Sequence, residues 1–390
     1  MGKKGYYITQ WSSAEDGFYP GPAKKINGQI KALRSYGLDI VYVGRDRNLK
    51  RQSVSVIKRI AMQIYSRLPF TEVLKDPDYT VVKMPDISNV RNADFLYIRF
   101  WWGDYQFGKA MQRLREQNPS AIIFLEFPDY PYRQKALGIR NYYMILKDRN
   151  CSRKYKGNID YAVTMDRVES IYGIPVQHMY NGIDTERIKK KQPLTKQDKT
   201  INIGFVATAK KSHGIDRLIK GMRQYYNQKE KNYLVKLILV GGGSAMESFV
   251  KYAEECNMDQ YVEKYGYQFG NQLDYICNSF DMAVDYLAIH RDGYEISSSL
   301  KSREYLARGI PIITSAKVDI CEDFGFKHIL SVESSEMPID INEIIEFYEE
   351  EYKDGQEAVV DDIRAFAEEK VDMKVTMQFV PQKLSSLNHK

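Results

Sequence analysis

Residues 281–316 hold the pattern that most constrains the fold of this chain. One apolar run, Asp281 to Leu287, predicts a buried strand, and a second run, Ile310 to Thr314, predicts the next strand. The residues between them predict an amphipathic helix, since Leu300, Tyr305 and Leu306 have helical spacing. Ser297, Ser298 or Ser299 can cap its start. Its end is marked by Gly309, Ile310 and Pro311. A strand, a helix and a second strand in this order predict an α/β fold with a parallel sheet.

Polar residues follow the first of these strands and open the helix. In open α/β sheets ligands bind at the carboxyl ends of strands, and a helix N-terminus favours an anion such as phosphate. Lys301 and Arg303 oppose the helix dipole at a cost of about 0.3–1 kcal/mol each, so we expect a bound anion to offset them. Glu304 lies one turn in, where it can accept hydrogen bonds from hydroxyl groups. The alternative is an ordinary strand–helix unit with a solvated, charged first turn.

The phrase SSSLKSREYLARGIPIIT resembles the donor-site helix of family 4 glycosyltransferases of the GT-B fold, and more narrowly their bacterial cell-surface polysaccharide branch. The resemblance implies two Rossmann-like, doubly wound parallel-sheet domains that face a central cleft. It implies that Glu304 holds the nucleotide ribose and that Lys301 stabilises the leaving diphosphate. The family's other glutamate, which touches the donor sugar, falls at Ile296, so we expect Glu295 to take that role through a shift of one residue. Further donor-site residues implied by the resemblance are Ser298, Ser299 and Leu300.

The start of the chain predicts a second sheet. Lys4 to Gln10 and Asp39 to Val43 have the apolar content of strands, and a helical pattern lies between them. We expect Gly17, Gly21 and Pro22 to form turns in the loop before this helix. The resemblance implies that this loop faces the cleft and that Gly21 contacts substrate.

A rigid aromatic loop, EFPDYPY, begins at the end of the predicted strand Ala121 to Phe127. It resembles the EIPTYPY loop of the polysaccharide branch, and Glu126 stands where other family members carry a histidine. We expect Glu126 to orient the acceptor hydroxyl and Tyr130 to contact the acceptor. The alternative for Glu126 is a solvent-facing loop acid.

The loop after the strand Ile201 to Val206 corresponds to the one that clamps the donor diphosphate in much of family 4, with an arginine and a lysine. Here Thr208 and His213 hold those two places. Lys210 or Lys211 can supply the missing charge, and we favour Lys211, although both can equally be solvated. Other expected substrate contacts are Tyr267, as a neighbour of the base, and Arg291, which with His290 helps to select the sugar.

Charge is distributed unevenly along the chain. Residues 1–190 contain 32 basic and 19 acidic residues, a net charge of +13, whereas residues 191–390 contain 25 basic and 32 acidic residues, a net charge of −7. This asymmetry predicts an anionic partner for the first half, which is nucleic acid, an anionic membrane surface or a phosphorylated lipid. No nucleic-acid-binding motif is present, so we expect no nucleic-acid partner. A basic amphipathic helix predicted over residues 50–68 lies either on a membrane surface or against the sheet.

The domain boundaries follow from composition and from the resemblance. We expect an acceptor-binding domain over residues 1–182, a donor-binding domain over residues 183–370, and a C-terminal helix at about residues 371–390 that packs back on the first domain. The charged, apolar-poor segment 181–200 is the predicted linker. A helix is also predicted around residues 167–172.

Neither disulfides nor metal ions are expected. The four cysteines lack metal or redox spacing, and no apolar run approaches the roughly 18 residues of a membrane span, so we expect a cytoplasmic protein with reduced thiols. The only Asp-x-Asp triplet, Asp76-Pro77-Asp78, predicts a proline turn away from the donor site. No cofactor is implied, because the nucleotide-sugar is a substrate.

The resemblance implies a retaining glycosyltransferase that moves a sugar from a nucleotide-sugar, with a UDP-sugar favoured, to an acceptor hydroxyl. The expected acceptor is a lipid-linked saccharide of exopolysaccharide, capsule or O-antigen synthesis, reached at the inner face of the plasma membrane. Two alternatives remain: a nucleotide-sugar-binding scaffold without turnover, and a nucleotide-sugar epimerase of the same fold.

Overall fold

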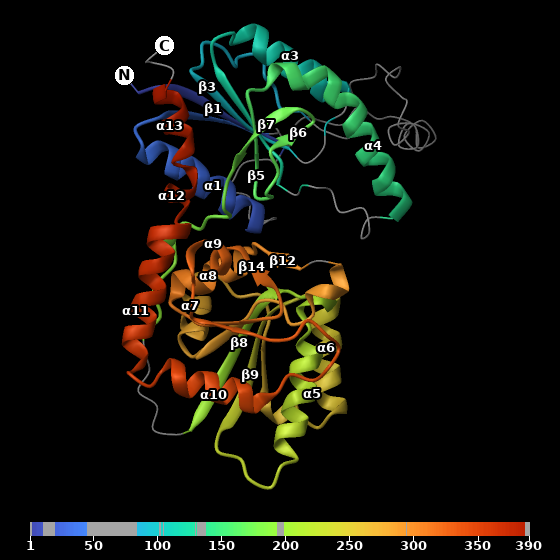
Figure 1. Ribbon diagram of the computed structural model, residues 1–390, viewed down its shortest axis with the longest axis vertical. Helices are drawn as coiled ribbons and strands as arrows, with labels where there is room; N and C mark the ends of the chain where they lie inside the picture. Colours follow the sequence, from blue (N-terminus) through green and yellow to red (C-terminus); the bar gives the residue numbers. More distant parts are fainter. Residues whose placement is uncertain are drawn as a thin grey trace. The chain divides into compact units, whose positions relative to one another are not determined.

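The computed structural model describes residues 2–10, 20–44, 84–100, 103, 105–128, 130, 138–192, 199–293 and 295–386. The chain divides into two compact units, each with its own sheet (Figure 1). Unit 1 comprises Met1–Tyr180 together with Thr376–Lys390, and unit 2 comprises Asn181–Val375. The predicted α/β class with two parallel sheets is confirmed.

Unit 1 is built on a seven-stranded sheet in the order β2-β1-β3-β4-β5-β7-β6. Its strands are β1 (Lys4–Thr9), β2 (Asp39–Val43), β3 (Phe95–Arg99), β4 (Ile122–Glu126), β5 (Tyr161–Thr164), β6 (Ser170–Ile171) and β7 (Ile174–His178). All pairs are parallel except β6 with β7, which is antiparallel. The polar residues that end β1, β3 and β4 therefore meet at one edge of the sheet.

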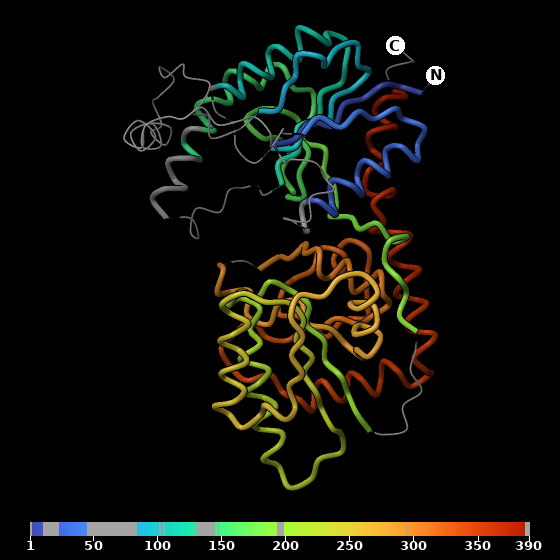
Figure 2. Tube along the Cα trace, turned by 180° about the vertical axis from the view of Figure 1, so that it is seen from behind, coloured from blue at the N-terminus to red at the C-terminus, as the bar shows by residue number. Residues whose placement is uncertain are grey.

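Helices cover both faces of this sheet. They are α1 (Pro20–Ser35), α3 (Tyr105–Gln117), α4 (Gly138–Tyr155) and α13 (Phe379–Ser386), with the short α12 (Met373–Met377) before α13. Buried side chains of α3 and α4 pack on the face that carries Leu96 and Ile98. On the opposite face, Phe379 of α13 lies against Phe124, with ring centroids 5.8 Å apart. The last helix also returns to β1, where Lys3 donates a hydrogen bond to the carbonyl of Leu384 (Figure 2).

Two sequence predictions in unit 1 are wrong. Helix α1 begins at Pro20, so Gly21 and Pro22 lie in its first turn and do not form a loop turn; proline is tolerated there because the first helical N–H groups have no partner within the helix. Residues 167–172 do not form a helix, because a hairpin of β6 and β7 takes their place. Its turn requires positive φ angles at Tyr172 (55°) and Gly173 (83°), and glycine adopts these without strain. Gly17, the basic segment 50–68 and Asp76–Asp78 lie outside the described residues.

Unit 2 is built on a six-stranded parallel sheet in the order β10-β9-β8-β11-β13-β15. Its strands are β8 (Thr200–Thr208), β9 (Leu234–Gly242), β10 (Val262–Tyr265), β11 (Met282–Val284), β13 (Ile312–Thr314) and β15 (Ile329–Ser331). Numbered along the chain within this unit, the order is 3-2-1-4-5-6, that of doubly wound dinucleotide-binding sheets. The order reverses between β8 and β11, and ligands of such sheets bind outside the carboxyl ends of the strands at that point.

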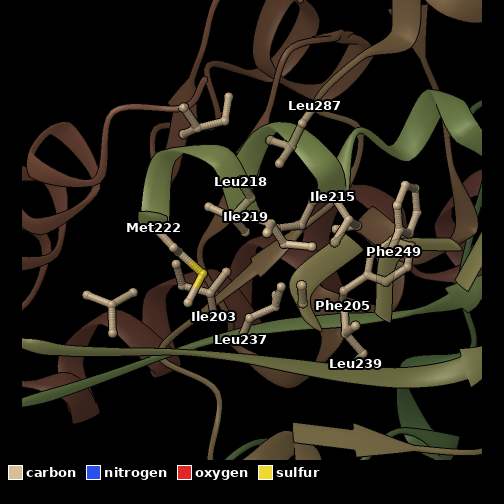
Figure 3. Close-up of a cluster of buried hydrophobic side chains, with 14 of the residues drawn as sticks. Ile203, Phe205, Ile215, Leu218, Ile219, Met222, Leu237, Leu239, Phe249 and Leu287 are labelled. Carbon is tan, nitrogen blue, oxygen red and sulfur yellow. The ribbon is translucent and has the colours of Figure 1, made fainter. Parts of the chain in front are cut away.

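Two layers of helices flank this second sheet. One layer contains α5 (Ile215–Tyr226), α6 (Ser244–Glu255) and α10 (Ile341–Glu351), and the other contains α7 (Gly270–Asn278), α8 (Leu300–Arg308) and α11 (Gln356–Phe366). Figure 3 shows Leu218, Ile219 and Met222 of α5 directed toward β8 and β9. Burying each such side chain stabilises the unit by about 1.5–3 kcal/mol. This packing places the N-terminus of α5 beside the carboxyl end of β8.

Residues 281–316, from which the strand–helix–strand pattern was predicted, fold largely as expected. Helix α8 spans Leu300–Arg308, Ser299 caps it by accepting a hydrogen bond from the Ser302 N–H, and Gly309 ends it with a φ of 77°. The predicted strands are present but shorter, as β11 and β13. The loop between β11 and α8 contains a 3-10 turn, Ile289–Asp292, and the strand β12 (Ile296–Ser297), which pairs with β14 (Lys317–Val318). The short α9 (Asp319–Phe324) follows β14.

Candidate functional site

The candidate donor site lies where β8 and β11 end, at the point where the strand order of unit 2 reverses. Asp285 follows β11 directly, and its side chain is completely buried. Its carboxylate accepts hydrogen bonds from Ser297 Oγ at 3.1 Å, Ser299 Oγ at 2.6 Å and Lys301 Nζ at 2.9 Å. A buried carboxylate requires such partners, since an unpaired one is strongly destabilising. Asp285 therefore joins the strand end to the first turn of α8.

Lys301 is held on three sides at this strand end. Its ammonium donates to the Asp285 carbonyl and to the Asp285 carboxylate, both at 2.9 Å, and lies 3.8 Å from the centre of the Tyr286 ring. Burial lowers the pKa of Lys301, and Asp285 partly opposes that shift. The anion that we expected to offset the cations of this turn is thus supplied in part by the protein itself.

Arg303, the second cation of this turn, is fully buried and engaged by protein groups. It donates to Asp319 at 2.5 Å, to the Asn181 carbonyl at 3.0 Å and to Ser298 Oγ at 3.2 Å. Asn181 in turn donates to the Ser298 carbonyl at 2.8 Å. Arg303 therefore holds the start of unit 2 against the loop before α8, and Asp319 offsets its charge.

The other donor residues expected on this helix differ in their surroundings. Ser298, Ser299, Leu300 and Glu304 are half-buried, and Ser299 is engaged as the helix cap and as a donor to Asp285. Glu295, by contrast, precedes β12, and its side chain is 84% exposed. Among the described residues its carboxylate makes one ion pair, at 3.9 Å to Lys317. The structure does not bring Glu295 into the hydrogen-bonded group around Asp285.

His213 lies in the loop after β8 and faces the same group. Its Nδ1 accepts the Lys210 N–H at 2.9 Å, so Nε2 carries the proton of the neutral ring. The ring packs 4.9 Å from the Tyr286 ring, beside Lys301. Burial, and then the charges of Lys301 and Lys210, lower the pKa of His213 to about 2. The neutral ring therefore keeps one N–H group, at Nε2.

Lysines of the same loop remain exposed. Lys210 and Lys211 both lie on the surface, and the Lys211 carbonyl accepts a hydrogen bond from Arg291 at 2.9 Å. Tyr267 is 55% exposed, donates or accepts a hydrogen bond at 3.2 Å with Thr208, and covers Gly242. Its exposed ring at the carboxyl end of β9 can stack on a planar ligand group.

Arg291 is held by carboxylates from two other segments. Nη1 and Nη2 each lie 2.8 Å from a different oxygen of Asp216, and Nη2 lies 2.5 Å from Glu336. His290 also bonds Glu336, at 2.8 Å. The hydrogen bonds that Arg291 donates to Glu336 and Asp216 raise the pKa of Arg291. Arg291 thus ties the loop after β11 to α5, and its charge is already balanced within the protein.

A second polar cluster lies at the carboxyl ends of β1, β3 and β4 in unit 1. At its centre is Glu126, the last residue of β4, whose side chain is 1% exposed. It accepts hydrogen bonds from Arg99 at 2.8 Å, Gln29 at 3.0 Å and Tyr97 at 2.7 Å, and Lys25 lies 3.4 Å away. Burial opposes ionisation, but Arg99 and Lys25 outweigh it and lower the pKa of Glu126. A solvent-facing loop acid is therefore the wrong description of Glu126.

Aromatic rings flank this end of β4. Tyr130 packs edge-on against Phe127 and Tyr172, with ring centroids 6.1 and 6.4 Å apart. The Tyr172 hydroxyl donates to Asp148 at 2.6 Å, and burial together with Asp148 raises the pKa of Tyr172. Gly21, the remaining expected contact, lies in the first turn of α1. Phe127, Tyr130 and Tyr172 therefore form one aromatic cluster, which begins at the residue after Glu126.

The described segments contain no metal-site cluster, no disulfide and no membrane-spanning helix. Within the described segments, no cluster of three or more His, Cys, Asp or Glu side chains has the arrangement of a metal site. None of the four cysteines forms a disulfide. No helix in the described segments has the length and apolarity needed to cross a bilayer.

Comparisons with solved structures place both units in one known architecture. Sucrose-phosphate synthase from Thermosynechococcus elongatus aligns over 100% of both chains with 15% identity and a TM-score of 0.58. A glycosyltransferase from Rickettsia africae aligns over 99% of this chain and 98% of its own with 9% identity and a TM-score of 0.60. WaaG, a glycosyltransferase involved in lipopolysaccharide biosynthesis, aligns over 98% and 99% with 10% identity and a TM-score of 0.56. The chain has the GT-B fold. No protein-family model matches it, and no curated protein matches its sequence.

Sequence reasoning missed two residues that the GT-B structure places beside Lys301. Asp285 carried a detectable signal, since an acid inside a run that is predicted as a buried strand is costly to bury without a partner. Tyr286 carried none, because its contact with the ammonium depends on where Lys301 folds back. Of the expected donor residues, Lys301 and Ser299 share one hydrogen-bonded group with Asp285, whereas Arg291 and Glu295 belong to other contacts.

Proposed function

We propose that this chain is a retaining glycosyltransferase that transfers a sugar from a nucleotide-sugar to an acceptor hydroxyl. The observation that carries the proposal is the position of the Lys301 ammonium, at the end of β11 where the strand order of a GT-B unit reverses. Diphosphate leaves with developing negative charge, and a preorganised cation stabilises that charge in the transition state by several kcal/mol. A compact, point-like ammonium suits this role.

The remaining donor contacts are proposed for residues near Lys301 and on the neighbouring loops. Glu304 on α8 is proposed to accept hydrogen bonds from the ribose hydroxyls, and the first turn of α8, with Ser298, Ser299 and Leu300, to lie against the diphosphate. Tyr267 is proposed to stack on the base, with a UDP-sugar as the favoured donor. Since His213 is neutral, it contributes a hydrogen bond, and the further positive charge comes from a lysine of the same loop, Lys211 in our assignment.

The acceptor is assigned to unit 1. Glu126, held in place by Arg99, is proposed to orient the acceptor hydroxyl, and Tyr130 and Gly21 to line its path. Glycosyltransferases of this fold include WaaG, which is involved in lipopolysaccharide biosynthesis, and this supports a lipid-linked saccharide of a cell-surface polysaccharide as acceptor. The positive charge of residues 1–190 favours work at an anionic membrane surface, on the cytoplasmic side. Salt-dependent co-sedimentation with anionic vesicles tests that assignment.

Catalysis without a metal ion is part of the proposal. Lys301 supplies the positive charge that a divalent cation provides in other transferases. Transfer activity that is unchanged by EDTA is the expected result, and loss of activity that Mg²⁺ or Mn²⁺ restores contradicts it.

The exposed position of Glu295 favours one alternative, a nucleotide-sugar-binding scaffold without turnover. The residue proposed to touch the donor sugar has its carboxylate in solvent beside Lys317. The scaffold binds a nucleotide-sugar but releases no nucleoside diphosphate when acceptor is added, so a turnover assay separates the two functions.

The deciding experiment measures melting temperature with UDP, GDP, ADP, dTDP and CMP, on the wild type and on Lys301→Ala. A ligand at about 100 times its Kd adds roughly 2.7 kcal/mol of stability, which is visible as a shift. Each protein is compared with its own ligand-free state, because Lys301→Ala also leaves Asp285 without its cation. We expect one nucleoside diphosphate to stabilise the wild type and the variant to lose that shift. The absence of a shift with every nucleotide contradicts the donor site.

A further inference from the structure

We infer that Asp285 is a positioning residue of the donor site, which holds the Lys301 ammonium in one orientation and as a cation toward the leaving diphosphate. This inference rests on the proposed function and adds a residue to it. Asp285 follows β11 and reaches substrate only through Lys301, so it is not assigned any direct part in the chemistry.

The contacts of Asp285 restrict where the Lys301 protons point. An ammonium has three N–H groups, and Asp285 accepts two of them, one with its carbonyl and one with Oδ1, both at 2.9 Å. The Tyr286 ring covers another side, 3.8 Å from Nζ. Among the residues that the structure describes, Lys301 makes no other hydrogen bond. Within that part of the chain one N–H is left for a ligand, in a direction that Asp285 and the Tyr286 ring set.

The carboxylate itself is held from two elements. Ser297 of β12 donates to Oδ2 at 3.1 Å, and Ser299, the cap of α8, donates to Oδ1 at 2.6 Å. Both hydroxyls orient Asp285 without changing its charge. Asp285 is completely buried, so its interaction with Lys301 is weakly screened by water and salt.

The charge of Lys301 depends on this one carboxylate. The groups that face the ammonium are Asp285 and Tyr286 after β11, and Lys210 and His213 after β8. Burial, and to a smaller extent Lys210, favour the neutral amine, whereas Asp285 favours the cation. His213 is neutral, and Glu304 is the acidic residue on the same turn of α8. Removing the Asp285 charge therefore makes Lys301 lose its proton at a lower pH.

A purely structural role for Asp285 predicts a different result. If the carboxylate only anchors the cap of α8, Asp285→Asn weakens folding, but the pH at which ligand binding fails does not move. The pH profile of binding separates the two roles, because stability alone does not change it.

The test measures the Kd of the nucleoside diphosphate that stabilises the wild type, from pH 6 to pH 10.5, by calorimetry. An opposite charge within hydrogen-bonding distance shifts a pKa by about 1–3 units, so we expect the alkaline loss of binding to move down by about 1–3 pH units in Asp285→Asn. Ser297→Ala is the matched control, since it removes a hydrogen bond to the same carboxylate and no charge. The pH at which Ser297→Ala loses binding on the alkaline side should equal that of the wild type.

Lys301→Arg keeps the test decisive if Asp285→Asn fails to fold. A guanidinium stays charged throughout this range, so Lys301→Arg should show no loss of binding at alkaline pH. A loss of binding at alkaline pH that persists in Lys301→Arg, or that occurs at the wild-type pH in Asp285→Asn, overturns the inference. Either result leaves the glycosyltransferase proposal intact. A wild type that binds no nucleoside diphosphate at any pH overturns the proposed function and the inference with it.

Discussion

Arg99 Nη1 lies 2.8 Å from Glu126 Oε1, and both side chains are almost completely buried. Glu126 ends β4 and Arg99 ends β3, so the pair joins two neighbouring strands at their carboxyl ends. Gln29 of α1 adds a hydrogen bond to the other carboxylate oxygen at 3.0 Å. This arrangement gives the carboxylate a fixed position, and it also makes the carboxylate part of what stabilises unit 1.

Glu126→Gln is expected to destabilise unit 1 by about 3–5 kcal/mol, because it leaves Arg99 buried without its counter-charge. Urea unfolding followed by hydrogen exchange of peptides that cover β3 and β4 reports on unit 1. Glu116→Gln on α3 of unit 1 is the control, since this exposed carboxylate accepts one hydrogen bond from Gln112 at 3.0 Å and a surface substitution changes stability by about 0.5 kcal/mol or less. A change in Glu126→Gln as small as in the control contradicts the buried-pair argument.

The same pair sets the acid sensitivity of unit 1. The pKa of Glu126 is lowered in the folded state, so its contribution is present above the unfolded value of about 4.3 and is lost as the pH falls through the lower folded value. Glu126→Gln should therefore lose less stability than the wild type below about pH 4.3.

Local sequence signals predicted the framework of the donor site but not its partners. Helix α8 with its cap Ser299 and its stop Gly309 follows from periodicity and capping rules that act over a few residues. Arg291, however, pairs with Asp216, 75 residues away, and no local pattern contains that contact. Sequence analysis therefore located the polar residues and could not say which of them are already neutralised by the protein.

At the hairpin of residues 170–178 the sequence prediction was wrong about local structure, where a helix was expected. The apolar residues before Gly173 are compatible with a helix, and the competing turn depends on one glycine and on Tyr172 adopting a positive φ. The Tyr172 hydroxyl bonds Asp148, which lies 24 residues earlier on α4. A tertiary contact thus supports a backbone conformation that local propensity disfavours.

Arg291→Lys tests whether Arg291 binds substrate or supports the loop. A lysine keeps the charge but loses the two parallel hydrogen bonds to Asp216, so we expect a loss of about 1.5–3 kcal/mol in stability. If Arg291 acts through the loop, Asp216→Asn should weaken nucleotide binding by a similar factor, although Asp216 lies on α5. A variant pair in which Arg291→Lys alone weakens binding assigns Arg291 to the substrate instead.

His213 is expected to stay neutral throughout the physiological range. Burial and the charges of Lys301 and Lys210 lower its pKa to about 2, so its ring should show no titration between pH 4 and pH 8. The measurement is the pH dependence of the histidine ring signals by NMR, with His213→Gln used to assign the signal. A midpoint near the usual value of about 6.5 means that the ring is solvated and that the cations do not face it.

His328 predicts a loss of stability in unit 2 as the pH rises. Its Nδ1 bonds Glu351 of α10, and its Nε2 lies 2.7 Å from Asp362 of α11. Burial opposes the charged ring, but these two carboxylates outweigh it and raise the pKa of His328. The stabilising charge is therefore complete below the unfolded value of about 6.5 and is lost as the pH rises through the higher folded value.

Hydrogen exchange of peptides that cover α10 and α11 measures this effect, because these helices carry Glu351 and Asp362. Protection factors, which remove the intrinsic pH dependence of exchange, should fall as the pH rises above about 6.5 in the wild type and change less in His328→Gln. Asp362→Asn removes one of the two carboxylates and keeps the ring, so its protection should begin to fall at a lower pH than that of the wild type. Equal slopes in all three proteins would show that His328 is not the charged link between these helices.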